Sequence, residues 1–228
     1  MDEAEIIRKN INELRNRIGA AAERSGRTGD EIKMVVVSKF RTIAEVQAVI
    51  DTGVMDIGEN RVQEALTKRP ELKGEFVFRM IGHLQRNKAG DAARIFDTVD
   101  SVDSLRLGQR LSEELQKIGK TMPVLVEINS SEEESKHGFE MEQVEEAAGS
   151  LSSLPAIKLR GIMTIGPLTE SEDAIRRAFE KTRLLYESIR RQVPDFDFLS
   201  MGMSDDFEVA IEEGSNMVRI GRAVFEGR

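Results

Sequence analysis

The stretch MVVVSKFRTIAEVQAVIDTGVMDIGEN (residues 34–60) determines the expected fold of this chain. It begins with a β-branched run at 34–37, continues with apolar residues at helical spacing over 43–50, and returns to a short strand pattern at 55–57. A strand, a helix and a second strand in this order form the repeating unit of parallel α/β proteins. The stretch therefore predicts a parallel sheet with helices packed against it.

The same alternation extends through the rest of the chain. An amphipathic helix is predicted over 6–21, because its apolar residues are three and four positions apart; it ends at Ser25 and Gly26. The predicted strands are 34–37, 55–57, 76–81, 98–99, 124–128, 159–165, 196–200 and 217–220. The predicted helices between them are 43–50, 61–67, 88–96, 105–118, 141–151, 172–191 and 206–213.

Eight strands alternating with helices in 228 residues indicate a closed (β/α)8 TIM barrel with an extra N-terminal helix, since such barrels usually have about 250 residues. An open doubly wound sheet is the alternative, but no G-x-G-x-x-G turn follows the first strand. No linker of biased composition interrupts the pattern, so we expect one α/β domain spanning residues 1–228. Both folds collect their functional residues at the carboxyl ends of the strands.

The overall composition disfavours several classes of function. The chain has 33 basic and 41 acidic residues, and the resulting net charge of −8 disfavours nucleic acid as a partner. There is no cysteine, which excludes disulfides, thiolate metal sites and cysteine nucleophiles. No secretory leader or membrane-length apolar segment is found, so we expect a cytoplasmic protein with no membrane partner.

Lys39 follows the predicted strand 34–37 and is expected at the mouth of the barrel. In a partly desolvated pocket its side chain would become a neutral amine that can attack an aldehyde. The competing interpretation is an ordinary lysine that extends into solvent.

The ends of the last two strands have the composition of a phosphate-binding site. Ser200, Gly202 and Ser204 lie at the end of strand 196–200, and Gly221 and Arg222 follow strand 217–220. Glycine lets backbone N–H groups approach a ligand, serine adds hydroxyl donors, and strands seven and eight commonly bind phosphate in barrels. The alternative is that the two glycines serve only to form turns.

Arg219 lies between Val218 and Ile220, so strand alternation directs its side chain into the barrel. A guanidinium at that position could donate a hydrogen bond to the nitrogen of a pyridine ring and discourage protonation of that nitrogen. A salt bridge with a buried acid is the alternative.

The other strand ends are less specific. Asn60 follows the second strand and could hydrogen-bond a ligand, and His83 follows the third strand and could line the pocket. Neither histidine has partners at metal-ligand spacing, so no metal site is predicted. Lys136, after the fifth strand, is a candidate for a secondary contact with an aldehyde or a phosphate.

Seven segments together resemble the pyridoxal phosphate homeostasis proteins, whose barrel is similar to the N-terminal domain of alanine racemase. They are VSK (37–39), GENRVQE (58–64), IGHLQ (81–85), KHGF (136–139), RGIMT (160–164), SMGMS (200–204) and VRIG (218–221). The resemblance implies that Lys39 holds pyridoxal 5'-phosphate as an imine. It also implies that Ser204, Gly221 and Arg222 contact the phosphate and that Arg219 lies beside the ring nitrogen. A small hydroxyl residue is common in the family at position 222, so for Arg222 the implication extends only to its backbone N–H.

The resemblance implies a protein that stores, protects or delivers pyridoxal phosphate to apoenzymes that depend on it, without robust catalysis. The alternative is an amino-acid racemase, which needs a second acid–base group besides the lysine, commonly a tyrosine. Tyr186 is the sole tyrosine and falls in the predicted helix 172–191, and the chain ends soon after the eighth strand with no second domain. We therefore expect a monomeric carrier; a phosphosugar aldolase using Lys39 is a more remote alternative.

Overall fold

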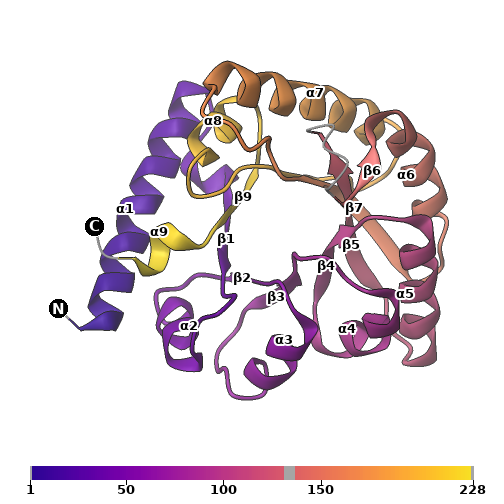
Figure 1. Ribbon diagram of the computed structural model, residues 1–228, viewed down its shortest axis with the longest axis horizontal. Coiled ribbons are helices and arrows are strands. Elements are labelled where there is room, and N and C mark those ends of the chain that lie inside the picture. The colour runs from indigo at the N-terminus through magenta and orange to yellow at the C-terminus, as the bar shows by residue number, and fades with distance from the viewer. Residues whose placement is uncertain (1, 131–136, 227–228) are drawn as a thin grey trace.

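The computed structural model describes residues 2–130 and 137–226, in which the strands form a closed ring surrounded by helices (Figure 1). The strands are β1 (Lys33–Val37), β2 (Asp56–Glu59), β3 (Val77–Met80), β4 (Thr98–Val102), β5 (Met122–Asn129), β6 (Phe139–Glu140), β7 (Ile157–Thr164), β8 (Phe198–Ser200) and β9 (Met217–Ile220). The ring runs β1, β2, β3, β4, β5, β7, β8, β9 and back to β1, and all its pairings are parallel. The short β6 pairs with the end of β5 and lies outside the ring.

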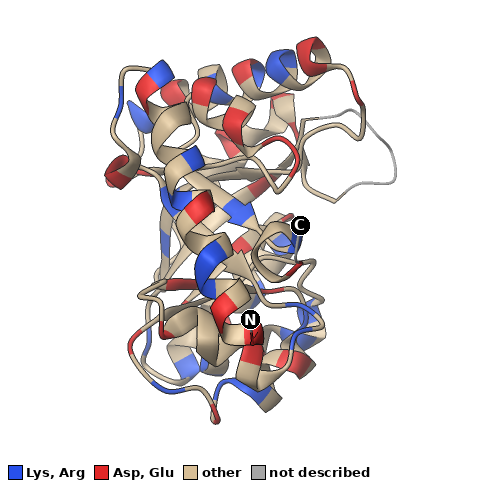
Figure 2. Cartoon of the chain, turned by 90° about the vertical axis from the view of Figure 1, so that its left-hand side faces the viewer, with Lys and Arg blue, Asp and Glu red and all other residues tan. Residues whose placement is uncertain are grey.

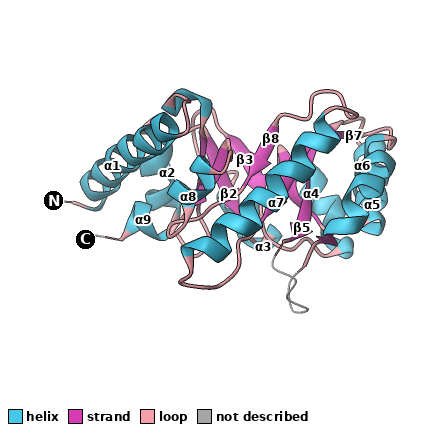
Figure 3. Cartoon of the chain, turned by 90° about the horizontal axis from the view of Figure 1, so that it is seen from above, coloured by secondary structure: helices cyan, strands magenta, loops and turns pink. Residues whose placement is uncertain are grey.

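Helices connect successive strands of the ring and cover its outer face (Figure 3). They are α1 (Glu3–Arg24), α2 (Ile43–Ile50), α3 (Val62–Lys68), α4 (Ala89–Ile95), α5 (Leu105–Lys117), α6 (Val144–Ser152), α7 (Glu172–Arg190), α8 (Phe207–Glu212) and α9 (Arg222–Phe225). Capping boxes define two of their starts: Asp2 pairs reciprocally with Glu5 at α1, and Thr42 pairs with Glu45 at α2. Acidic and basic residues are interspersed along these helices in the view of Figure 2.

The interior of the barrel has an apolar centre between polar ends. The central layer consists of Val35, Leu125, Met163 and Met217. At the amino-terminal end of the strands, Arg79 Nε donates to Asp56 at 2.6 Å, and its Nη1 donates to Asp100 at 3.1 Å. These ion pairs neutralise a guanidinium that would otherwise be costly to bury. The opposite end of the barrel is left for the functional site.

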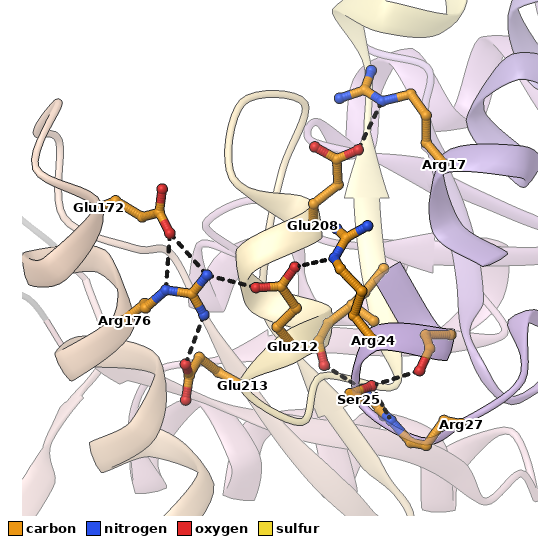
Figure 4. Close-up of polar contacts among 11 residues, drawn as sticks. Arg17, Arg24, Ser25, Arg27, Glu172, Arg176, Glu208, Glu212 and Glu213 are labelled. Atoms are coloured by element: carbon orange, nitrogen blue, oxygen red, sulfur yellow. Dashed lines mark hydrogen bonds and ion pairs between the residues drawn. The ribbon is translucent and has the colours of Figure 1, made fainter. Parts of the chain in front are cut away.

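The N-terminal helix α1 packs against α8 and α9, which belong to the other end of the chain. Arg24 of α1 and Arg176 of α7 both pair with Glu212 of α8, at 2.6 and 2.5 Å (Figure 4). Arg27, just after α1, donates to the carbonyl of Ser215 at 2.9 Å. The first helix is therefore packed against the helices at the C-terminal end of the chain.

The structure confirms the predicted TIM barrel with an additional N-terminal helix. The predicted bounds of α2 and β9 match the observed ones, whereas β4 extends three residues beyond the predicted 98–99. The two-residue β6 and the four-residue α9 were not predicted, because segments this short contain too few residues to show a hydrophobic period. Within the described residues, no helix combines the length and apolar character needed to cross a membrane.

Candidate functional site

A pocket of about 240 Å³ opens at the carboxyl ends of the strands, beside β1, β2 and β9. Six of the nine predicted site residues line it: Lys39, Asn60, Ser204, Arg219, Gly221 and Arg222. Apolar side chains complete its walls, from Val37, Ile81, Ile165 and Met203. The fold therefore brings together residues from both ends of the sequence.

Lys39 follows β1 and lines the pocket with an exposed side chain. It makes no hydrogen bond or ion pair with any residue that the structure describes. The next residue, Phe40, has a φ of 62°, a left-handed conformation that is rare for an aromatic side chain. Its N–H donates to Glu64 Oε2 at 3.1 Å, which stabilises that conformation. The prediction that Lys39 lies in a partly desolvated environment is wrong, because its side chain is exposed.

A buried ion pair lies beneath the loop that carries Lys39. Lys68 Nζ donates to Glu59 Oε2 at 2.7 Å, to the Ser38 carbonyl at 2.7 Å and to Glu64 Oε2 at 3.2 Å. The Ser38 hydroxyl also donates to Glu59 Oε2, at 3.0 Å. This network joins α3 to the end of β1. Sequence reasoning missed it, because partners in different elements leave no local pattern.

Arg219 lies inside the barrel at the base of the pocket and is 4% exposed. Its guanidinium donates to the Ser200 hydroxyl at 2.6 Å, to the Ser200 carbonyl at 3.0 Å and to the Thr164 carbonyl at 2.6 Å. Burial lowers the pKa of Arg219, although nearby carboxylates oppose this effect. The inward orientation predicted from strand alternation is confirmed. Neutral oxygens hold this guanidinium, and the structure shows no ion pair between Arg219 and another described residue.

Two predicted residues lie beside the pocket and do not line it. Ser200 is fully buried, and its hydroxyl accepts a hydrogen bond from the Arg219 guanidinium. Gly202 has a φ of 94°, and a Cβ at this position would lie 2.6 Å from Ala210 Cβ and 2.9 Å from Phe207 Cα. Its glycine is therefore required by the turn after β8 and by the close approach of α8.

The predicted phosphate side of the pocket consists of Ser204, from the loop after β8, together with Gly221 and Arg222, where α9 begins. The Arg222 side chain is exposed and pairs with Asp205, which also lines the pocket. A carboxylate already engages this guanidinium, so the backbone of position 222 is the better candidate for binding an anion.

Asn60 contributes a polar atom without a partner. Its Oδ1 is buried and accepts no hydrogen bond from any described residue. Such groups are uncommon in native proteins, because an unsatisfied buried acceptor costs about 1–3 kcal/mol. A donor on a bound ligand would satisfy this oxygen.

Glu127 on β5 is a buried acid that sequence reasoning missed. Its Oε2 has no hydrogen-bond partner among the described residues. Burial, reinforced by the charge of Asp103, raises the pKa of Glu127 to about 7, although Arg219 opposes this rise. The signal that could have identified it is the one used for Arg219, since Glu127 also lies between two apolar residues, Val126 and Ile128.

His83 lines a different pocket, formed beyond β3, β4 and β5. Its ring stacks on that of His137, with centroids 3.9 Å apart, and its Nδ1 lies 2.9 Å from Asp103 Oδ2. The expectation of no metal site rested on spacing along the sequence, whereas the fold brings His83, Asp103 and His137 together. Lys136 lies outside the described residues.

Tyr186 lies on α7, in the outer layer of helices. Its hydroxyl donates to the carbonyl of Phe196 at 3.1 Å, and its ring stacks on the Phe196 ring with centroids 5.5 Å apart. Tyr186 is buried and does not line the pocket that contains Lys39. Its position is consistent with the predicted packing role.

Comparisons with known proteins find a matching family model and similar proteins over nearly the whole chain. Residues 5–228 match the family model "Alanine racemase, N-terminal domain". The pyridoxal phosphate homeostasis protein of Escherichia coli K12 is 38% identical over 229 residues, covering 97% of each chain. That of Pseudomonas aeruginosa is 39% identical over 223 residues, covering 97% of this chain and 96% of the relative.

Solved structures of other proteins also superimpose on nearly the whole chain. PipY of Synechococcus elongatus PCC7942, with pyridoxal phosphate bound, superimposes with a TM-score of 0.84 at 28% identity, covering 96% of this chain and all of PipY. A Clostridium difficile alanine racemase has a TM-score of 0.80 at 19% identity. This chain covers 98% of its own length but only 57% of that racemase, so the latter likeness concerns the fold of one part of the enzyme.

Proposed function

The chain belongs to the family of pyridoxal phosphate homeostasis proteins, and on this premise we propose that it binds pyridoxal 5'-phosphate through Lys39. The protein then serves to store, protect or deliver this cofactor. The observation that carries the proposal is the exposed Lys39 amine, which has no partner among the described residues and shares a pocket with Ser204, Gly221 and Arg219.

The residues of the pocket fit this cofactor. Pyridoxal phosphate supplies an aldehyde that condenses reversibly with a primary amine, on a pyridine ring that also carries a hydroxyl and a phosphate. Lys39 offers the amine, and Ser204 and the backbone of Gly221 and Arg222 offer donors to the phosphate. The unpaired Oδ1 of Asn60 supports the presence of a polar ligand at this point of the pocket.

Arg219 favours retention of the cofactor over catalysis. We propose that its guanidinium donates a hydrogen bond to the ring nitrogen and leaves that nitrogen unprotonated, since a guanidinium rarely gives up its own proton. An unprotonated ring withdraws electrons weakly from bonds that would have to break during turnover. Three hydrogen bonds to Ser200 and Thr164 hold the guanidinium in position for this role.

The position of Tyr186 supports a carrier rather than a racemase. Racemisation needs two acid–base groups that face opposite sides of the same carbon atom. The chain contains one tyrosine, and its hydroxyl is bonded to the Phe196 carbonyl away from the pocket. We propose that Lys39 acts as a reversible tether with no tyrosine partner in this chain.

Reconstitution with pyridoxal phosphate tests the attachment. After borohydride reduction and peptide mass spectrometry, we expect one adduct on Lys39 in the wild-type protein and none in Lys39→Ala. Lys120→Ala is the matched control, because Lys120 is an exposed lysine that does not line the pocket. If the wild-type protein bound no cofactor and Lys39 carried no adduct, the proposal would be wrong.

A second experiment distinguishes the carrier from the racemase. The cofactor-loaded protein is incubated in deuterated water with single enantiomers of amino acids, and α-proton exchange is followed by NMR spectroscopy. We expect no rapid exchange. Rapid exchange accompanied by loss of optical purity would establish the racemase instead.

We further propose that the protein is a cytoplasmic monomer with one domain, and that apoenzymes dependent on pyridoxal phosphate receive the cofactor from it. Light scattering measures the molar mass in solution, which we expect to equal that of one chain. Delivery predicts that an apoenzyme regains activity faster from the loaded protein than from an equal concentration of cofactor buffered to the same free level.

A further inference from the structure

Three side chains with metal-binding atoms meet in a second pocket at the same end of the barrel. His83 follows β3, Asp103 follows β4, and His137 precedes β6. One ligand atom from each of them lies within 4.8 Å of the other two. This pocket has a volume of about 590 Å³ and shares no lining residue with the pocket of Lys39.

The two imidazole rings adopt an unusual mutual arrangement. They are nearly parallel, at 14°, with centroids 3.9 Å apart, and the Nδ1 atom of His83 lies 2.9 Å from Asp103 Oδ2. The Asp103 carboxylate is therefore already in contact with one of the two rings.

The dimensions suit a transition-metal ion. Zinc binds histidine nitrogen at about 2.0–2.1 Å, so the ligand atoms of a tetrahedral site are about 3.3 Å apart. The present atoms, all within 4.8 Å of one another, would need to move closer by up to about 1.5 Å, which side-chain rotation can supply at the surface. His83 is 41% exposed and Asp103 12% exposed, so the histidine is free to adjust while the carboxylate is held more firmly.

We propose that His83, Asp103 and His137 form a binding site for a divalent transition-metal ion such as Zn²⁺. Two nitrogen ligands and one carboxylate favour zinc, nickel or cobalt over magnesium and calcium, which prefer sites made entirely of oxygen. Three protein ligands leave at least one coordination position open to solvent. Arg86 and Arg106 line the same pocket, so an anion in the open position would be stabilised by positive charge.

Calorimetric titration of the untagged protein with Zn²⁺ tests this site. We expect one ion per chain, and a weakening in each of the variants His83→Gln, His137→Gln and Asp103→Asn that is at least the roughly 10–100-fold typical for loss of an outer-shell partner. Asp91→Asn is the matched control, since Asp91 is a half-exposed acid on α4 and does not line this pocket; its variant should bind like the wild type. Circular dichroism verifies that each variant is folded.

Titration with Co²⁺ provides a measurement on the wild type alone. Low-symmetry coordination by imidazole nitrogen should give visible absorption that saturates at one equivalent and disappears when Zn²⁺ is added. The proposal is overturned if neither ion binds saturably to the wild type, or if both histidine variants bind Zn²⁺ as the wild type does. The second result would indicate diffuse binding to the acidic surface.

Discussion

Glu127 and Arg219 are ionisable residues with opposite charges inside the same end of the barrel, and they are held in different ways. Arg219 has three neutral hydrogen-bond acceptors, whereas one oxygen of Glu127 has no partner among the described residues. Burial therefore acts on Glu127 with little compensation, and its pKa rises from 4.5 to about 7. The protein is most stable when this carboxyl is protonated.

The stability of the folded state should consequently decrease as pH rises from about 4.5 to about 7. The pKa of Glu127 is higher in the folded than in the unfolded state, so between these values the folded state binds more protons. Each unit of the shift contributes about 1.4 kcal/mol, so the loss is on the order of 3 kcal/mol. Glu127→Gln removes this ionisation, and we expect the variant to gain about 2–3 kcal/mol relative to the wild type between pH 5 and pH 8.

Urea unfolding at both pH values, in buffer containing a chelator, measures this difference. Glu180→Gln, an exposed position on α7, is the control and should retain the pH dependence of the wild type. An equal pH dependence in the wild type and Glu127→Gln would show that Glu127 ionises normally in the folded protein.

Strand alternation is the signal that made single residues predictable. It directed Arg219 inward correctly, and the same argument applied to Glu127 would have identified the second buried charge. Alternation gives no information on residues that follow a strand. Asn60 directly follows β2 and His83 lies three residues beyond the end of β3, and they line different pockets, because the local path of each loop determines the direction of the side chain.

At the scale of elements, the loop after β1 depends on α3. Lys68 and Glu59 are 6% and 0% exposed, and their ion pair also binds the Ser38 carbonyl and hydroxyl. Glu64, four residues before Lys68, fixes the left-handed Phe40 through its backbone N–H. Although burial raises the pKa of Glu64, hydrogen bonds from Phe40 and Lys68 hold it below its ordinary value. These contacts determine the position from which Lys39 reaches the pocket.

Removal of one member of this ion pair should destabilise the protein strongly. Lys68→Met leaves Glu59 as a buried charge without its cation, and we expect a loss of about 3–5 kcal/mol in the free energy of unfolding. The double variant Glu59→Gln/Lys68→Met should lose less than the sum of the two single variants, because it retains no unpaired charge. Urea unfolding of all three variants completes the cycle.

Lys9→Met is the control for this cycle. Lys9 is exposed on α1 and pairs with Glu13 at 3.7 Å, so its removal should change the free energy of unfolding little. If Lys68→Met were as mild as Lys9→Met, the buried pair would have no special role in holding the loop.

The elements themselves were predictable where they are long enough to show a period. The apolar residues of 43–50 and the β-branched run of 34–37 predicted α2 and β1 closely, because tertiary packing reinforces their local preference. The network of Lys68 and Glu59 was not predictable, since it depends on the register between β1 and β2. That register is a property of the assembled sheet and has no counterpart in the local sequence.

At the scale of the whole molecule, the two ends of the chain meet beside the pocket. Asn10 of α1 is 8% exposed, and its Nδ2 donates to the carbonyls of Val224 at 3.0 Å and Glu226 at 3.1 Å. These bonds hold α9, whose first residue, Arg222, lines the pocket of Lys39. A further hollow of about 230 Å³ lies between α1 and α9, and Ser204 and Arg222 line both cavities.

The barrel could be predicted from the number and order of its elements, but the role of the first helix could not. Eight parallel strands have few ways to form a closed sheet. In the simplest one the last strand of the ring pairs with the first, and this is the observed pairing of β9 with β1. The extra helix α1 could have packed on either end of the barrel or over any of its helices. The amphipathic pattern of α1 shows that one face is buried without indicating the partners, which the structure identifies as α2, α8 and α9.

The placement of Asn10 predicts that α1 influences the phosphate side of the pocket and not the aldehyde side. Asn10→Ala frees α9, so the affinity for pyridoxal 5'-phosphate should fall about tenfold, or about 1.4 kcal/mol. The affinity for pyridoxal, which lacks the phosphate, should change less than about twofold, because α3 holds the loop that carries Lys39 through the bond from Lys68 to the Ser38 carbonyl. Arg15→Ala is the control, since Arg15 bonds the Thr52 carbonyl away from α9. Spectroscopic titration with both compounds measures the affinities, and equal losses for the two would show that Asn10 acts on the barrel as a whole.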